Sequence, residues 1–189
     1  MDSFEHSDLP QTQGTHQPPA GWTHKPGDGW VHCACGQRHW GKNGAAGLFL
    51  ARQTGAGHIQ IALQHRALWS HQGGTWSIPG GAIMDGEQAQ DAALREAFEE
   101  AGVNSRDVTV IGQIALEHPD WTYTTFVALF SPDEGSSPLD QVLFPTDAES
   151  IEVRWIDLAQ LIAPTPSVPL LPAFHSALES LTDVLRANM

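Results

Sequence analysis

Residues 80–103, GGAIMDGEQAQDAALREAFEEAGV, decide the fold of this chain. The stretch opens with Gly80 and Gly81, continues past Gly86 with a run of helix-forming residues and reaches a fourth glycine, Gly102, next to its end. We expect a glycine turn and then a helix that starts at Asp85 or Gly86, because either residue can cap a helix. Acidic Glu87 would then lie in the first turn, and Gly102 would end the helix as its C-terminal capping residue.

This helix would concentrate carboxylates within one turn. At about 100° per residue, Glu96, Glu99 and Glu100 fall on one face, and Arg95 can reach Glu99 at the i+4 position. The like-charge pair Glu96–Glu100 costs about 0.2–0.5 kcal/mol on an open surface, whereas a hard divalent cation binds such oxygen ligands favourably. The neighbouring face is apolar and should pack on a core: Leu94, Ala97, Phe98 and Ala101.

An acidic helix face exposed to water is the plainer interpretation of three glutamates. The glycine turn before the helix and the fixed distance to Glu87 favour a cation site instead. Together they form the pattern G-x5-E-x7-R-E-U-x-E-E-x-G-U, where U is apolar. Its fixed positions are Gly81, Glu87, Arg95, Glu96, Ala97, Glu99, Glu100, Gly102 and Val103.

This pattern resembles the signature box of the Nudix hydrolases and matches it at every fixed position. The family hydrolyses nucleoside diphosphates linked to another moiety and uses magnesium or manganese. The resemblance implies an α/β sandwich with a mixed central sheet and helices on both faces. It also implies a small nucleotide-type diphosphate or a nucleoside triphosphate as substrate, and cleavage of a pyrophosphate bond.

Site roles follow from the resemblance, residue by residue. Four groups would bind the metal: the carboxylates of Glu96, Glu99 and Glu100 and the carbonyl of Gly80. Arg95 would orient Glu99. One of these glutamates, or a glutamate from a later loop, would take the proton of the attacking water. Glu149 is the late-loop candidate, and Glu152 is a further option. Gly81, Glu87 and Gly102 would shape the box.

Composition limits the other possibilities. The chain has 189 residues, a length that suits one domain, and 41% of its residues are hydrophobic. The net charge of −13 argues against binding of nucleic acid polymers. No apolar run is long enough to span a membrane, no signal peptide is recognisable, and two cysteines imply no disulfide framework. We therefore expect a cytoplasmic protein.

The chain divides into three expected parts. Residues 1–28 are rich in proline and histidine and read as a flexible arm. Residues 29–163 would form the Nudix domain, with strands at 45–52, 58–65, 75–78, 108–116, 123–130 and 150–156 and a short helix at 157–162. Residues 164–189 would carry a helix whose apolar stripe is Phe174, Leu178, Leu181 and Leu185. That stripe should pack on the domain, although a homodimer contact is possible.

Residues 30–40 suggest a hairpin with a turn at Gly36. A zinc site is one interpretation of its sulfur and imidazole side chains, which are His32, Cys33, Cys35 and His39. Zinc prefers four nitrogen or sulfur ligands, and paired cysteines usually lie two to four residues apart. Here one residue separates the cysteines and no second pair exists. The spacing therefore favours a plain hairpin with small thiols, and zinc stays the alternative.

Trp121 and Tyr123 lie between two expected strands after the helix, so they are candidates for stacking on a nucleobase. Ordinary loop packing explains them equally well. Two other functions remain open. An isopentenyl-diphosphate-isomerase-like enzyme would need a catalytic cysteine, but Cys33 and Cys35 precede the core strands. A non-catalytic nucleotide-sensing module would not need the complete set of glutamates with Arg95.

Overall fold

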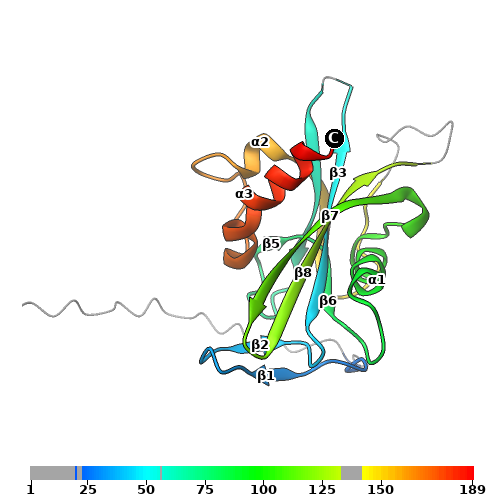
Figure 1. Cartoon of the computed structure of the whole chain (residues 1–189). Helices are drawn as coiled ribbons and strands as arrows, with labels where there is room; N and C mark the ends of the chain where they lie inside the picture. The colour runs from blue at the N-terminus through cyan, green and yellow to red at the C-terminus, as the bar shows by residue number, and fades with distance from the viewer. Residues whose placement is uncertain (1–19, 21–22, 56, 133–141) are drawn as a thin grey trace, which may run out of the picture.

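The computed structural model describes residues 20, 23–55, 57–132 and 142–189 of the chain. A seven-stranded mixed sheet forms the central layer, with α1 on one face and α2 and α3 on the other (Figure 1). A separate two-stranded sheet, β1–β2, lies across one end of the molecule. This architecture confirms the expected α/β sandwich.

The elements follow the order of the sequence. The strands are β1 (Trp30–His32), β2 (Arg38–Trp40), β3 (Ala45–Gln53), β4 (Ile59–Arg66), β5 (Trp76–Ser77), β6 (Gly80–Ala82), β7 (Val108–His118), β8 (Trp121–Phe130) and β9 (Ser150–Asp157). The helices are α1 (Ala89–Ala101), the 3-10 turn η1 (Ser105–Asp107), α2 (Leu158–Leu161) and α3 (Pro172–Ala187).

Strand β3 is the centre of the sheet. The strand order is β5-β4-β3-β8-β7, with β6 also paired to β3 and β9 also paired to β4. Only the β3–β8 pairing is parallel, and it runs from Ala45 opposite Tyr123 to Ala51 opposite Leu129. Residues of β3 are buried on both faces, as expected for a strand covered by helices on either side.

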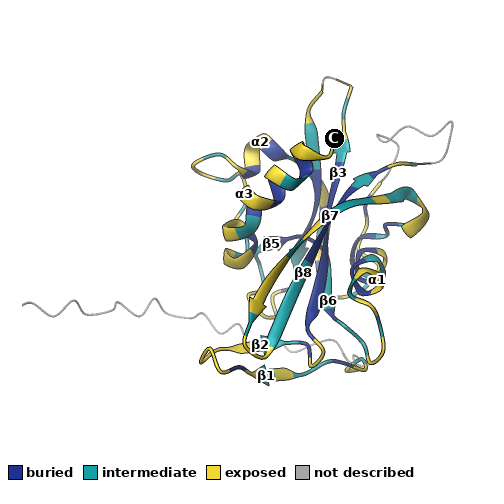
Figure 2. Cartoon of the chain, viewed as in Figure 1, coloured by how far each residue is buried: buried dark blue, intermediate teal, exposed yellow. Residues whose placement is uncertain are grey.

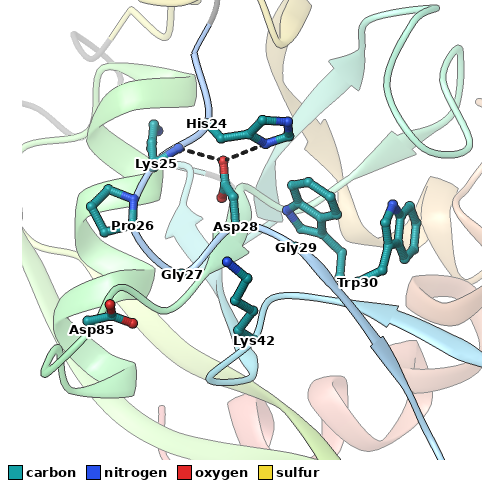
Figure 3. A pocket seen from close by; sticks show the side chains of 10 residues that line it. His24, Lys25, Pro26, Gly27, Asp28, Gly29, Trp30, Lys42 and Asp85 are labelled. Atoms are coloured by element: carbon teal, nitrogen blue, oxygen red, sulfur yellow. Dashed lines mark hydrogen bonds and ion pairs between the residues drawn. The ribbon is translucent and has the colours of Figure 1, made fainter.

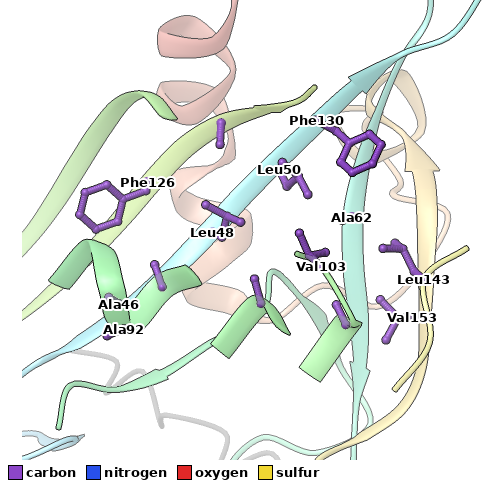
Figure 4. Close-up of a cluster of buried hydrophobic side chains, with 14 residues drawn as sticks. Ala46, Leu48, Leu50, Ala62, Ala92, Val103, Phe126, Phe130, Leu143 and Val153 are labelled. Atoms are coloured by element: carbon purple, nitrogen blue, oxygen red, sulfur yellow. The ribbon is translucent and has the colours of Figure 1, made fainter. Parts of the chain in front are cut away.

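Alternating side chains of β3 enter two cores. Ala46, Leu48 and Leu50 face α1, where the helix contributes mainly small residues (Figure 4). Phe49 and Ala51 face the opposite core. The predicted stripe of the C-terminal helix, Phe174, Leu178, Leu181 and Leu185, is buried in that second core (Figure 2). The helix therefore packs on the domain.

The glycine-rich segment before α1 differs from the prediction. Gly80–Ala82 is a short strand, β6, and not a turn, because it pairs antiparallel with the end of β3. Helix α1 begins only at Ala89, with Gln88 at its N-cap position, so Asp85 and Gly86 do not cap it. Glu87 lies before the helix and not in its first turn.

The packing face of α1 also differs from the prediction. Phe98 is 55% exposed, although the helical wheel placed it toward the core. Ala92 and Ala93 are fully buried instead. The helix thus turns its small residues to the sheet and approaches it closely. Its end at Gly102 is as predicted, with φ of 70° in the left-handed region.

Most of the expected N-terminal arm, residues 1–19 and 21–22, lies outside the described residues. The rest does not behave as a free arm, because Lys25 contacts α1 and Asp28 accepts a hydrogen bond from the Lys25 backbone N–H (2.8 Å). No helix among the described residues is both long and apolar enough to cross a membrane.

Replacing Gly102 should destabilise the domain. Its φ of 70° is strained for any residue with a Cβ, at a cost of about 1–2 kcal/mol. Gly102→Ala should lower the free energy of unfolding by that amount in urea denaturation. Gly55→Ala is the matched control, because an added Cβ there meets no atom within 4 Å and the backbone is not left-handed. Equal stability of the two variants would contradict the capping role.

Candidate functional site

Three glutamates project from α1, and the structure buries two of them. Glu96 is 5% exposed and Glu100 is 1% exposed, while the side chain of Glu99 retains 30% exposure. The alanines of α1 allow the helix to lie close to the sheet, so these carboxylates reach the backbone of β6. The acidic face is therefore an enclosed cluster and not a water-exposed helix surface.

Glu100 is the most deeply held of the three. Its Oε2 atom accepts hydrogen bonds from the Gly80 backbone N–H (2.7 Å) and the Gln64 side-chain amide (2.6 Å). The Ser150 hydroxyl in turn donates to the Gln64 side-chain oxygen Oε1 (2.7 Å). Burial and the neighbouring Glu96 carboxylate raise the pKa of Glu100 well above its ordinary value.

Gln64 is a site residue that sequence reasoning missed. Gln64 alternates with Ile61 and Leu63 in the sequence, a pattern typical of a position that faces water, yet Gln64 is fully buried. A polar residue in a strand whose neighbours are buried could have given the signal, because a buried amide requires hydrogen-bond partners.

Arg95 connects the segment before α1 to the carboxylates. Its Nε and Nη2 atoms donate to the two carboxylate oxygens of Glu87 (2.8 and 2.9 Å), and Nη2 also donates to the Ala82 carbonyl (3.0 Å). Its Nη1 atom donates to Glu96 (2.6 Å) and Glu99 (3.1 Å). Arg95 thus contacts Glu99 as expected, but its two-pronged pair is with Glu87.

Glu87 is ionised in this arrangement. Its hydrogen bonds from Arg95 and from the Met84 backbone N–H hold the pKa of Glu87 below its ordinary value, although burial acts in the opposite direction. The segment before α1 is therefore tied to the helix by a charge-assisted pair, which is stronger than a neutral hydrogen bond.

Gly81 makes room for Glu96. A Cβ atom on Gly81 would lie 2.7 Å from the carboxyl carbon of Glu96, closer than such atoms approach in proteins. The glycine at this position of the box is needed for the space that the carboxylate fills.

Lys25 supplies a cation to the cluster, and no motif in the sequence predicts this role. Its Nζ atom lies 2.6 Å from Glu99 Oε2, in an ion pair between two partly exposed side chains. Burial opposes the charge of Lys25, but Glu96, Glu99 and Glu149 outweigh it and raise the pKa of the ammonium.

The late-loop candidate Glu149 lies near this cluster. It is half-buried and close enough to Lys25 to influence its pKa. Its backbone N–H donates to Asp147 (2.9 Å), a further acidic residue that sequence reasoning missed. Burial and the charge of Glu149 raise the pKa of Asp147. Glu152, the other option, instead forms an ion pair with Arg154 on β9.

The two aromatic candidates lie in different surroundings. Trp121 stacks on His39 (ring centroids 4.5 Å apart, 11° between planes), and its indole N–H donates to the Trp40 and Gly41 carbonyls (3.1 Å each). Tyr123 reaches the glycines of β3 and β6 with its hydroxyl. Burial and the Glu100 charge raise the pKa of Tyr123. Contact of either side chain with a nucleobase stays a prediction.

A cavity of about 600 Å³ is lined mainly by residues 24–42, which precede the central sheet (Figure 3). Lys25 belongs to this lining and connects the cavity to Glu99. Lys25 and Lys42 contribute cations, Trp30 and Trp40 contribute aromatic surface, and Asp85 contributes a carboxylate. Asp28 also lines the cavity, so cationic and aromatic side chains lie beside two carboxylates there.

The hairpin predicted at residues 30–40 forms, with Trp30 opposite Trp40 and Gly36 in the turn. Cys33, Cys35 and His39 place one ligand atom each within 4.8 Å of the other two, whereas His32 does not join them. Both cysteines are free thiols.

Two curated relatives match most of this chain. A Bifidobacterium longum protein named "Nucleoside triphosphate pyrophosphatase/Nudix hydrolase fusion protein" is 46% identical over 152 residues, 79% of this chain. A Mycobacterium tuberculosis protein named "Putative 8-oxo-dGTP diphosphatase 3" is 38% identical over 152 residues, 77% of this chain. The matches span 29% and 64% of the relatives' own lengths.

Solved structures show the same fold. RenU, a Nudix hydrolase from M. smegmatis, superposes with a TM-score of 0.72 at 37% identity, covering 85% of this chain and 96% of its own. The Ap4A hydrolase of C. elegans in a binary complex superposes with a TM-score of 0.58 at 21% identity, covering 77% and 98% of the two chains, which indicates the fold alone.

The family assignment combines the arrangement of the box with these matches. A family model described as "NUDIX domain" matches residues 41–176, which include every strand of the seven-stranded sheet and the whole of α1. With its complete signature box, its fold and its relatives, the chain belongs to the Nudix hydrolase family.

Proposed function

We propose that this protein hydrolyses a pyrophosphate bond in a nucleoside triphosphate or a nucleoside diphosphate derivative, with the help of a divalent metal ion. The observation that carries the proposal is the enclosed cluster of Glu96, Glu99 and Glu100, beside which the Lys25 ammonium pairs with Glu99. An anionic substrate cannot approach this cluster unless cations neutralise it first.

The residues fit magnesium or manganese. All the candidate donors are oxygen atoms, which hard divalent cations prefer. The Lys25 ammonium, 2.6 Å from Glu99, already marks a position where positive charge is stabilised. Glu96, Glu99, Glu100 and the Gly80 carbonyl are the proposed ligands, and Asp147 and Glu149 lie near enough to add negative charge.

The bound metal ion would polarise the phosphoryl oxygens and lower the pKa of the attacking water. The protein residues hold that arrangement in place. Arg95 fixes Glu96 and Glu99 through its Nη1 atom, and Gly80 and Gln64 fix Glu100.

We propose that Glu99 or Glu149 accepts the water proton. Glu99 is the most exposed of the three helix glutamates, so solvent reaches it most readily. Glu149 reaches the same region from the loop before β9. Glu96 is a less accessible alternative, because it is 5% exposed.

The names of the relatives and the cavity support a nucleotide as substrate. One relative carries 8-oxo-dGTP in its name and another carries nucleoside triphosphate. In the cavity, Lys42 would meet phosphate oxygens, and Trp30 or Trp40 would contact the base. Trp121 and Tyr123 are further candidates for base contact, and Trp121 also positions β2 through its bonds to the Trp40 and Gly41 carbonyls.

A substrate panel tests the proposal. The full chain should be incubated with 8-oxo-dGTP, ordinary nucleoside triphosphates, ADP-ribose and a dinucleoside polyphosphate, each with magnesium, and the products should be identified by chromatography. We expect hydrolysis of a phosphoanhydride bond in at least one of them and none in chelator. Tight binding without turnover would indicate a nucleotide-sensing module and would contradict the proposal.

Removing the charge of Glu99 should abolish most of the activity. Glu99→Gln removes both a metal ligand and a candidate base, and loss of general-base catalysis alone costs about 10²–10⁴-fold in rate. The measurement is kcat on the best substrate at saturating magnesium. Glu152→Gln is the matched control, because Glu152 pairs with Arg154 on β9 and should not affect the rate. Similar rates in both variants would exclude Glu99 from the reaction.

Lys25→Met should tighten metal binding. Lys25 occupies a position next to Glu99 that a divalent cation would compete for, so its removal leaves the carboxylates without that counter-charge. We expect manganese affinity to rise several-fold in calorimetry of the metal-free protein. Lys42→Met should leave this affinity unchanged, because the ion pair to Glu99 is made by Lys25. Weaker binding in Lys25→Met would show that Lys25 helps to hold the metal.

Glu100 should make the metal-free protein less stable as pH rises. Its pKa is raised on folding, so between the ordinary carboxyl value and the raised one the folded state binds more protons than the unfolded state. Stability then falls with pH through this window, by at most about 1.4 kcal/mol per pH unit. Glu100→Gln keeps an acceptor for Gly80 and Gln64 but does not titrate.

The measurement is urea denaturation in chelator from about pH 5 to about pH 8, the range above the ordinary carboxyl pKa. The stability of Glu100→Gln relative to the natural chain should increase across this range. Comparing the two proteins at each pH cancels groups that titrate in both. A constant difference would mean that Glu100 is already ionised at low pH.

A further inference from the structure

The β1–β2 hairpin gathers three side chains that the carboxylate chemistry does not use. Cys33 and Cys35 come from the turn, and His39 comes from β2. We propose that these three residues bind a zinc ion, at a site separate from the glutamate cluster of α1.

The distances suit a tetrahedral zinc ion. With Zn–S bonds of about 2.3 Å and Zn–N bonds of about 2.0–2.1 Å, sulfur and nitrogen ligands lie about 3.5 Å apart and two sulfurs about 3.8 Å apart. Cys35 Sγ lies 3.3 Å from His39 Nε2, and all three ligand atoms lie within 4.8 Å of one another. Small side-chain movements would complete the geometry.

The backbone of the turn produces this arrangement. The Cys33 N–H donates to the Gln37 carbonyl (3.0 Å), and the Gly36 N–H donates to the Cys33 carbonyl (2.9 Å). Gly36 has φ of 85°, so the chain reverses tightly there. The segment after the turn brings His39 back beside Cys35. One residue between the cysteines is therefore enough, and the unusual spacing does not exclude a shared ion.

Neighbouring residues fix the turn and the imidazole. The Asp120 carboxylate accepts a hydrogen bond from the Ala34 N–H (2.7 Å), which lies between the two cysteines. The His39 ring stacks on Trp121 (4.5 Å, 11°) and contacts the His118 ring (centroids 4.2 Å apart). Such supporting contacts are typical around metal ligands because they orient the side chains.

The donor chemistry separates this site from the carboxylates. Thiolates and imidazole favour zinc, whereas magnesium and manganese favour oxygen. Cys33 is 7% exposed and Cys35 is exposed, so the ion has an access route from solvent. The three protein ligands leave the fourth tetrahedral position to water.

A zinc ion would add to the contacts that hold the small sheet. Its strands have three residues each and do not belong to the seven-stranded sheet. A two-stranded hairpin of this kind is marginal in water by itself. Trp30 and Trp40 on these strands line the cavity, so a zinc ion across the turn would fix one of its walls.

Metal analysis of the untagged full chain tests the site. The protein should be purified without oxygen, in excess magnesium to occupy the carboxylates, and its zinc content measured by mass spectrometry. We expect about one zinc ion per chain. Cys35→Ser and Cys33→Ser should lose it, and His32→Ala, the matched control in the same hairpin, should retain it.

Cobalt substitution keeps the test valid even if the cysteine variants fold poorly. Cobalt bound to the natural chain should give the thiolate charge-transfer absorption that carboxylate ligands cannot produce. Absence of this band together with absence of zinc would overturn the proposal. So would zinc retained in Cys35→Ser, which would assign the ion to other ligands, or an intact mass that shows a Cys33–Cys35 disulfide.

Discussion

The burial of the Glu96 and Glu100 carboxylates between α1 and the sheet is the constraint on which the site depends. Buried charges must be paired or hydrogen-bonded, and here each partner comes from a different element. Arg95 comes from the helix itself, the Gly80 N–H from β6 and the Gln64 amide from β4. The small residues of α1 are part of the same constraint, since larger ones would move the carboxylates away from the sheet.

The two ends of the site have different chemistry. The α1 side carries carboxylates, whereas residues 24–42 contribute two lysines and two tryptophans together with His24 and Asp28. Under the proposed function the first set would bind the metal ion, and the second would contact the phosphates and base of a nucleotide. The segment before the central sheet thus takes part in substrate binding under the proposed function, although its composition resembles that of a linker.

Local patterns predicted the sheet, the helices and the box, because each depends on periodicity and on residues close in sequence. Lys25 and Asp147 could not be found in this way, since their proximity to Glu99 of α1 arises from long-range folding. The helical-wheel prediction placed Phe98 in the core because Phe98 is apolar. The helix instead packs on the sheet through its alanines. The start of α1 was misplaced because Glu87 resembles a first-turn residue but pairs with Arg95 from outside the helix.

The parallel pairing of β3 with β8 has a consequence for how the chain folds. The box lies between these strands in the sequence, so β6 and α1 are synthesised before β8 exists to complete the centre of the sheet. Bringing strands that are far apart in the sequence together costs chain entropy before their contacts form, and this cost slows folding. A nascent chain that has emerged only as far as Gly102 carries its glutamates on a helix without a finished sheet behind it. The hydrogen-bond partners of Glu96 and Glu100 all precede Gly102 in the sequence, whereas β8, which completes the centre of the sheet, follows it.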